Sequence, residues 1–263
     1  MPLAAEYRQQ FGWRSSNLIF QQLPLRWGQT VLDMGCGIGD QARELGTRGC
    51  KVIGLDANEE LINEATSAKP INCEFRTCDL GDLPELGIRA GGIWCSFAAA
   101  YFTNLSELLR QWAQFLETGG WIAITEIDDL FGHEPLSMRT RSLLQDYADD
   151  ALAGARYDFR MGGKLQEHLT QAGFAVSRVL TLPDKELSFR GPAAPEVVVA
   201  WQKRFERMKL LRKFCASEFE TVREEFLSCL TRPEHLRQLG LCLASPLKRA
   251  KSYAGKFMRR IKS

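Results

Sequence analysis

Residues 31–40, with the sequence VLDMGCGIGD, constrain the fold of this chain more than any other segment. A short apolar run leads into Gly35, Gly37 and Gly39 and then directly into a helical pattern. Glycine is needed where the backbone turns sharply and where a ligand lies against bare peptide groups. The segment therefore predicts a buried strand that enters a helix through a ligand-binding turn.

The same alternation of strand and helix patterns continues along the first half of the chain. Apolar runs predict strands at 30–35, 51–56, 71–79, 91–97 and 119–128, and amphipathic patterns predict helices at 40–49, 57–68 and 106–117. Short strands that alternate with helices in this way indicate a parallel sheet with helices on both faces.

The second half of the chain is mainly helical. We expect helices at 136–153, 161–172, 196–214 and 217–230, a strand at 174–182, and a last strand at either 239–245 or 185–190. The predicted fold class is α/β: a doubly wound, mostly parallel, seven-stranded Rossmann-like sheet with helices on both faces and a helical C-terminal insertion or cap. The expected divisions are an N-terminal helical lid (1–29), a Rossmann-like domain (30–182), a mostly helical cap (183–247) and a basic tail (248–263).

Two carboxylates follow the second and third predicted strands. Asp56 ends the second strand, and Asp79, followed by Leu80, ends the third. A carboxylate at the first place accepts hydrogen bonds from both hydroxyls of a ribose. A carboxylate beside a backbone N–H at the second place suits an exocyclic amine and a ring nitrogen of a base. Because the carboxyl ends of parallel strands meet at one edge of a sheet, these residues predict a pocket for an adenosine group.

Two cofactors contain such a group, a nicotinamide dinucleotide and S-adenosylmethionine. Residues 37–42 fit a permissive G-x-G-x-x-A pattern, so a nucleotide-dependent oxidoreductase is one alternative. A pyrophosphate binds at a helix N-terminus, where the carboxylate of Asp40 would repel it. S-adenosylmethionine carries a sulfonium and an ammonium instead, and acidic residues such as Asp40 and Asp33 suit both. Asp40 is also expected to be the N-cap of the helix.

Four segments in order resemble the motifs of class I S-adenosylmethionine-dependent methyltransferases: VLDMGCGIGD, GLDAN, EFRTCDLGDLP and LETGGWIAITE. The resemblance covers residues 31 to about 127, roughly the first half of the chain. It departs from the family pattern at residues 116–120, where the usual Leu-x-Pro-Gly-Gly lacks its proline. That turn is structural, so the change bears little on function.

The resemblance implies a set of cofactor-binding residues at the ends of the first four strands. The glycine turn would approach the methionine moiety, and Asp56 and Asp79 would hold the ribose and the adenine. Ser96 and Phe97, after the fourth strand, would face the sulfonium. The full set assigned to S-adenosylmethionine and its product S-adenosylhomocysteine is Asp33, Gly35, Cys36, Gly37, Gly39, Asp40, Asp56, Ala57, Asp79, Leu80, Ser96 and Phe97.

An aromatic cluster near the N-terminus leaves two alternatives open. Tyr7, Phe11 and Trp13 have a helix-like spacing, and Arg14 follows them. In one alternative the helix is a lid, in which aromatic faces such as Tyr7 stabilise a sulfonium and Arg14 pairs with the methionine carboxylate. In the other, the helix packs its apolar stripe on the sheet. Tyr7 and Arg14 are therefore included among the cofactor-binding candidates.

The sequence narrows the class of methyl acceptor mainly by excluding some classes of methyltransferase. The chain has no Pro-Pro and no Pro-Cys pair, which removes the motifs of amino-methylating and cytosine-C5 DNA enzymes. We expect an enzyme that methylates O or N of a small-molecule metabolite; a non-catalytic module that binds the cofactor is a further alternative. His133, after the fifth strand, is a candidate general base, or else an exposed loop histidine. Tyr101 is a candidate to flank the methyl group, or else a packed core residue.

Charge and cysteine usage limit the partners. The last sixteen residues hold seven Lys and Arg and no acid, which leaves 27 basic against 32 acidic residues in the rest of the chain. An acidic body disfavours nucleic acid, while the tail is either solvated or an amphipathic helix that touches an acidic surface. The eight cysteines and three histidines show no zinc spacing. We expect a cytoplasmic monomer or homodimer without a metal or stable membrane insertion.

Overall fold

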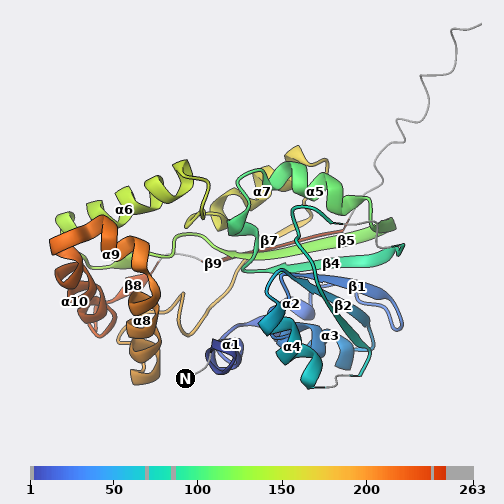
Figure 1. Ribbon diagram of the computed structural model, residues 1–263, viewed down its shortest axis with the longest axis horizontal. Coiled ribbons are helices and arrows are strands. Elements are labelled where there is room, and N and C mark those ends of the chain that lie inside the picture. The colour runs from blue at the N-terminus through green and yellow to red at the C-terminus, as the bar shows by residue number, and fades with distance from the viewer. Residues whose placement is uncertain (1–2, 69–70, 84–86, 238–239, 247–263) are drawn as a thin grey trace, which may run out of the picture.

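The computed structural model describes residues 3–68, 71–83, 87–237 and 240–246. Its main sheet has seven strands in the order β3-β2-β1-β4-β5-β9-β7 (Figure 1). The strands are β1 (Thr30–Met34), β2 (Lys51–Asp56), β3 (Cys73–Thr77), β4 (Ala90–Ser96), β5 (Leu116–Ile127), β7 (Arg178–Thr181) and β9 (Gly240–Pro246). The first five pair in parallel, while β9 runs antiparallel between β5 and β7. The predicted Rossmann-like α/β fold is confirmed.

Helices cover both faces of this sheet, as Figure 1 shows. On one face, α5 (Leu105–Ala113) and α7 (Leu165–Gln171) pack against apolar side chains of the central strands. On the other face, α2 (Ser16–Phe20) and α3 (Asp40–Thr47) do the same, and α4 (Glu59–Ser67) packs against β2 and β3. Strands buried on both faces have continuous apolar sequences, which is why the sequence pattern located them.

Four further helices form a second core at the left of Figure 1. They are α6 (Met138–Ala153), α8 (Pro195–Arg207), α9 (Lys209–Cys215) and α10 (Phe219–Leu230). Because α6 lies between β5 and α7 along the chain, this helical cap consists of two separate segments. The predicted division at 183 therefore separates α6 from the helices against which it packs. The single helix predicted at 196–214 is two helices that meet at Met208.

The structure differs from the predicted fold in several details. The N-terminal helical stretch is two helices, α1 (Leu3–Phe11) and α2. The last strand is β9, because the competing segment 185–190 makes only isolated bridges. A small second sheet pairs β6 (His133–Glu134) with β8 (Leu236–Arg237). The basic tail, 248–263, lies outside the described residues. None of the helices in the described ranges is both long and apolar enough to cross a membrane.

The glycine turn allows a direct test of why glycine is required. Gly39 has φ 77°, and a Cβ there would lie 2.5 Å from the ring of Phe75 on β3. Gly28 has the same φ of 77° but nothing within 4 Å of its Cβ position. We expect Gly39→Ala to lower the free energy of unfolding by about 1–3 kcal/mol more than Gly28→Ala, because only Gly39→Ala adds a clash to the backbone strain. Urea unfolding of the two variants measures this difference; equal losses would contradict it.

Candidate functional site

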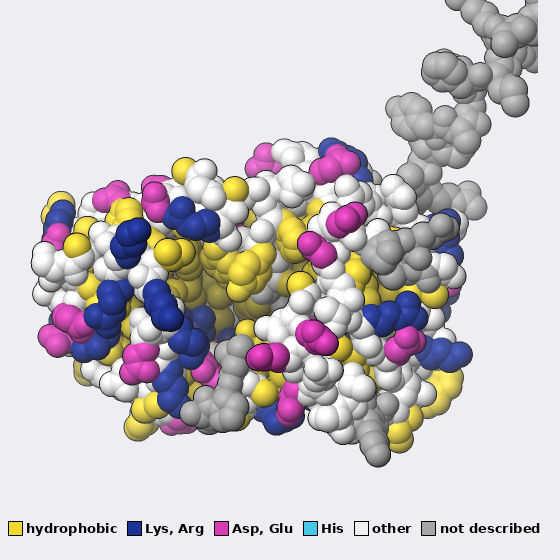
Figure 2. All heavy atoms as spheres, in the orientation of Figure 1, with side chains coloured by type: hydrophobic (Ala, Val, Ile, Leu, Met, Phe, Trp, Pro, Cys, Tyr) yellow, Lys and Arg dark blue, Asp and Glu magenta, His cyan; other side chains and the backbone are white. Residues whose placement is uncertain are grey.

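A large cavity opens at the carboxyl ends of β1, β2 and β4, where open α/β sheets bind ligands. Its volume of about 560 Å³ falls within the range of small-molecule sites, roughly 300–1,000 Å³. Figure 2 shows a hollow near the middle of the molecule, with hydrophobic side chains in its floor. The predicted site residues that line the cavity are Tyr7, Arg14, Gly35, Cys36, Gly37, Asp40, Asp56, Ala57, Asp79, Leu80, Ser96, Phe97 and Tyr101.

The glycine turn forms one wall of this cavity in a conformation that other residues rarely adopt. Gly35 has φ 77°, and a Cβ there would lie only 2.4 Å from the Cβ of Ala98. Gly37 has φ 53°, and its Cβ position lies 3.7 Å from the ring of Tyr7. The Tyr7 ring thus lies beside the turn, as the lid alternative requires. Bare peptide groups line the cavity here because side chains would not fit at Gly35.

Two carboxylates at the strand ends accept hydrogen bonds from backbone N–H groups. Asp56 accepts hydrogen bonds from the backbone N–H groups of Gly37 and Asn58, each at 2.9 Å. Asp79 accepts one from the N–H of Gly81 at 2.8 Å. Each carboxylate oxygen has two lone pairs, so both groups keep acceptor capacity toward the cavity. The backbone therefore orients the carboxylates and leaves them able to bind a ligand.

Two acidic residues near the turn differ from the prediction. Asp33 is buried behind the turn and does not line the cavity. Asp40 does line it, but α3 begins at Asp40 and Gly39 takes the N-cap position, so the predicted cap is wrong. The Asp40 carboxylate instead pairs with Arg43 one turn along the helix.

The end of β4 supplies two further lining residues. Ser96 accepts a hydrogen bond from Gln41 Nε2 at 3.1 Å. Phe97 has φ 57°, an uncommon conformation for a bulky residue, and its backbone N–H donates to Thr125 on β5 at 2.9 Å. Strain of this kind persists only where its surroundings maintain it, and it concentrates at functional sites. The backbone conformation holds the Phe97 ring at the cavity wall.

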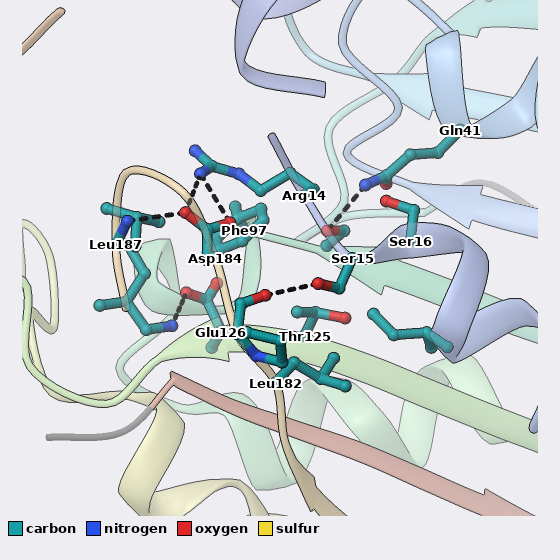
Figure 3. A pocket seen from close by; sticks show the side chains of 14 residues that line it. Arg14, Ser15, Ser16, Gln41, Phe97, Thr125, Glu126, Leu182, Asp184 and Leu187 are labelled. Atoms are coloured by element: carbon teal, nitrogen blue, oxygen red, sulfur yellow. Dashed lines mark hydrogen bonds and ion pairs between the residues drawn. The ribbon is translucent and has the colours of Figure 1, made fainter. Parts of the chain in front are cut away.

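Arg14 lines the cavity, but its guanidinium belongs to an ionic cluster within the protein. Its Nη1 atom lies 2.9 Å from both carboxylate oxygens of Asp184, and its Nη2 lies 2.9 Å from Glu186. Figure 3 shows Arg14 and Asp184 facing each other at a small cavity of about 40 Å³ that adjoins the large one. The predicted pairing of Arg14 with a methionine carboxylate is therefore not available in this arrangement, because two acidic residues already occupy the guanidinium.

A second buried acid, Glu126 at the end of β5, also lines the small cavity. It accepts hydrogen bonds from the backbone N–H groups of Ala100 at 3.0 Å and Ile127 at 3.2 Å. Burial raises the pKa of Glu126 to about 7, since removal from water disfavours the charged form. The Glu126 carboxylate therefore holds the segment after β4 in place, by accepting a hydrogen bond from the backbone N–H of Ala100.

The two catalytic candidates lie in different parts of the molecule. Tyr101 lines the large cavity, is 62% exposed, and packs edge-on against Tyr157 with a centroid distance of 4.9 Å. His133 is only 1% exposed and lies in the helical cap. Its Nδ1 atom lies 2.9 Å from Nε2 of His235, and its ring packs against Trp201. The prediction of His133 as a general base is wrong, because the chain leads away from the cavity after β5.

Among the lining residues that the sequence analysis did not predict, two belong to the acceptor side. Arg204, on α8, and Tyr157, after α6, reach the cavity from the helical cap. Neither lies in a motif, and their segments come close to β1 and β2 only through tertiary packing. The helical spacing of α8 identifies its buried face but gives no signal for the cavity.

Asp33 leads to a pH-dependent prediction. Neither of its carboxylate oxygens has a hydrogen-bond partner in the described part of the chain. Burial, and secondarily the charge of Asp56, raise the pKa of Asp33 from 3.8 to about 8. The unfolded chain releases this proton near pH 3.8 and the folded protein only near pH 8, so the group reduces stability as the pH rises through that window.

We therefore expect Asp33→Asn to be more stable than the wild type, by an amount that grows with pH over the same window. Urea unfolding of both proteins at a series of pH values measures the difference. Asp82→Asn is the control, because Asp82 is exposed and should give no such trend. A stability difference that is independent of pH would contradict the prediction.

The fold and the cavity at the strand ends define a Rossmann-like methyltransferase, of the class that uses S-adenosylmethionine. The family model described as "Methyltransferase domain" matches residues 6–179. The chain belongs to this family, which confirms the resemblance found in its sequence.

Curated relatives match part of the chain. It is 26% identical over 114 residues to a malonyl-[acyl-carrier protein] O-methyltransferase of Pseudescherichia vulneris, a match that covers 43% of this chain and 45% of that protein. It is 31% identical over 108 residues to the human mitochondrial ubiquinone biosynthesis O-methyltransferase, a match that covers 38% and 29%, respectively. The matched segments thus span less than half the length of these relatives.

Solved structures share the fold over most of the chain. An S-adenosylmethionine-dependent methyltransferase from Mesorhizobium loti is 20% identical with a TM-score of 0.53, and the match covers 88% of this chain and 96% of that one. A phosphoethanolamine N-methyltransferase from Haemonchus contortus is 19% identical with a TM-score of 0.58, covering 90% and 54%. At these identities the likeness concerns the fold alone.

Proposed function

We propose that the chain is an S-adenosylmethionine-dependent methyltransferase that transfers a methyl group to O or N of a small-molecule metabolite. One observation carries this proposal: the glycine turn, Asp56, and Asp79 with Leu80 all line a single cavity of about 560 Å³. These residues come from the ends of three different strands. Family membership supports methyl transfer, and the names of the curated relatives support an oxygen acceptor.

The residues present fit the cofactor. The bare peptide groups at Gly35 and Gly37 line the cavity, and a side chain at Gly35 would clash with Ala98 in the opposite wall. Asp56 and Asp79 retain lone pairs for ribose hydroxyls and an adenine amine. Three carboxylates line this end of the cavity, those of Asp40, Asp56 and Asp79, which suits a cationic ligand and disfavours a pyrophosphate.

The protein's part in the reaction is alignment. S-adenosylmethionine supplies a methyl group already activated by a sulfonium. Ser96 and Phe97, at the end of β4, and Tyr101, in the short 3₁₀ helix that follows, would border the reacting atoms and exclude water from them. In-line transfer depends on holding the acceptor in the correct geometry, and the constrained backbone at Phe97 provides a rigid wall for that purpose.

Calorimetric titration of the purified chain with S-adenosylhomocysteine tests this proposal, with NAD⁺ and NADH titrated in parallel. We expect saturable binding of S-adenosylhomocysteine and none of the dinucleotides. Absence of binding would overturn the proposal, and binding of NAD⁺ or NADH alone would favour an oxidoreductase. A labelled-methyl assay against a panel of hydroxyl- and amine-bearing metabolites then separates an enzyme from a module that binds the cofactor without transfer.

A further inference from the structure

The large cavity has two ends of opposite character. Asp40, Asp56 and Asp79 line the end formed by the strand tips, and Arg204 lines the side formed by the helical cap. Figure 2 shows Lys and Arg side chains gathered along the rim of the hollow, over α8 and α9. An anionic ligand would be repelled by the acidic end, which the cofactor is proposed to occupy. The Arg204 side is therefore the place for an anionic group of a second ligand.

Arg204 is only partly satisfied by its protein partners. Its Nη2 atom donates to Glu186, and its guanidinium carbon lies 5.0 Å from the centroid of the Trp201 ring. Its Nε atom is buried and has no hydrogen-bond partner among the described residues. A buried donor without a partner is costly, so the protein alone does not satisfy this guanidinium. Its side chain remains 19% exposed where it lines the cavity, so its other N–H groups can donate to an acceptor atom of a ligand.

The ionic cluster around Arg204 is formally neutral. Glu186 is shared between Arg204 and Arg14, and Arg14 also pairs with Asp184. Because the two acids balance the two arginines, net charge does not attract a ligand to this point. A ligand would instead be bound by hydrogen bonds from the remaining N–H groups of Arg204. Such charge-assisted hydrogen bonds are stronger to a carboxylate than to a neutral oxygen.

Aromatic side chains surround the same side of the cavity. Tyr101 and Tyr157 form an edge-on pair beside it, and Phe97, whose ring packs against the guanidinium of Arg14, also lines the cavity. Burial raises the pKa of the Tyr157 hydroxyl above its ordinary value of 10, and the charge of Arg204 opposes that rise, in keeping with its position near the pair. The Tyr157 phenol is therefore neutral and able to donate a hydrogen bond at pH 7. The surroundings suit a ligand with an apolar body and a single anionic group.

We infer that Arg204, Tyr101 and Tyr157 form the acceptor subsite, and that the methyl acceptor is a small apolar molecule bearing a carboxylate. This inference rests on the proposed function, because it assigns the remainder of the cavity once the cofactor occupies the acidic end. Arg204 binds the carboxylate, and the tyrosine pair contacts the apolar body and directs its nucleophilic atom toward Ser96 and Phe97.

The test measures whether the chain distinguishes a carboxylate from its neutral counterpart. The full chain, saturated with S-adenosylhomocysteine, is titrated with hydroxyphenylacetate and hydroxyoctanoate and with the primary amide of each. We expect at least one acid to bind roughly tenfold or more tightly than its amide, since a charge-assisted hydrogen bond is lost in the amide. Analogues that carry a phosphate monoester in place of the carboxylate form a third arm; a preference for these would overturn the carboxylate assignment.

Two variants test whether Arg204 is the residue that causes the preference for an acid over its amide. Arg204→Met should abolish the preference for the acid while leaving S-adenosylhomocysteine affinity unchanged. Lys203→Met is the matched control, because Lys203 precedes Arg204 on α8 but does not line the cavity, and it should keep the preference. Arg204→Lys retains the charge and serves if Arg204→Met unfolds; it should reduce the preference without eliminating it.

The outcomes separate this inference from the proposed function. If no acid is preferred, or if the preference survives Arg204→Met in a folded protein, the acceptor subsite is wrong. If S-adenosylhomocysteine binds in either case, the proposed function stands. If S-adenosylhomocysteine does not bind the wild type, the proposed function itself has failed.

Discussion

Replacement of Asp56 by alanine is expected to weaken S-adenosylhomocysteine binding roughly a hundredfold. The carboxylate keeps free lone pairs toward the cavity while Gly37 and Asn58 hold it in place, and it is proposed to accept hydrogen bonds from both ribose hydroxyls. Hydrogen bonds to a charged group contribute about 1.5–3 kcal/mol each, and each 1.4 kcal/mol is about a factor of ten in affinity. Calorimetry of the variant and the wild type at the same pH and salt concentration measures the change.

Two controls separate binding from folding in this experiment. Glu59→Ala removes one negative charge from the first turn of α4, three residues beyond Asp56, at an exposed position that does not line the cavity. It should leave the affinity within about twofold of the wild type, since exposed charges interact weakly across water. Asp56→Asn keeps an acceptor oxygen for one of the two backbone N–H groups, which donate to different carboxylate oxygens, and should also lose affinity. Wild-type affinity in a folded Asp56→Ala protein would remove Asp56 from the site.

The strand ends could be predicted from sequence because local pattern determines them. The predicted and observed bounds of β2 are the same, 51–56, since its apolar run is bounded by charged residues. Once the strands are known to be parallel, their carboxyl ends must meet at one edge. Asp56 and Asp79 could therefore be placed in one cavity although they lie on different segments of the chain.

The acceptor side could not be predicted in the same way, because its residues come together only through long-range packing. His133 follows β5 closely in sequence, yet the chain turns into the helical cap, where His133 contacts His235 and Trp201. Arg204 reaches the cavity from the opposite direction, and no local pattern marks it. Residue spacing shows which face of a helix is buried, but not which other segment covers that face.

The contacts of Arg14 also arise only through long-range packing, and they lead to a large expected effect on stability. Its partners, Asp184 and Glu186, lie 170 and 172 residues away in sequence. Glu186 is fully buried, with no exposed surface, and bridges Arg14 and Arg204. Removing one member of a buried ionic cluster leaves a charge without compensation, at a cost of about 3–5 kcal/mol. Glu186→Ala is thus expected to lower the free energy of unfolding by about that amount.

The pH dependence distinguishes this ionic effect from a simple loss of packing. Burial alone would raise the pKa of Glu186, but Arg204 and Arg14 hold it at about 2, below the ordinary 4.5. Its stabilising contribution is therefore complete above pH 4.5 and disappears as the pH falls toward 2. Urea unfolding should show the difference between wild type and Glu186→Ala narrowing over that window, whereas a packing defect would give a constant difference. Glu196→Ala, which removes an exposed carboxylate paired with Lys185, should change stability far less than Glu186→Ala at every pH, because exposed ion pairs contribute little.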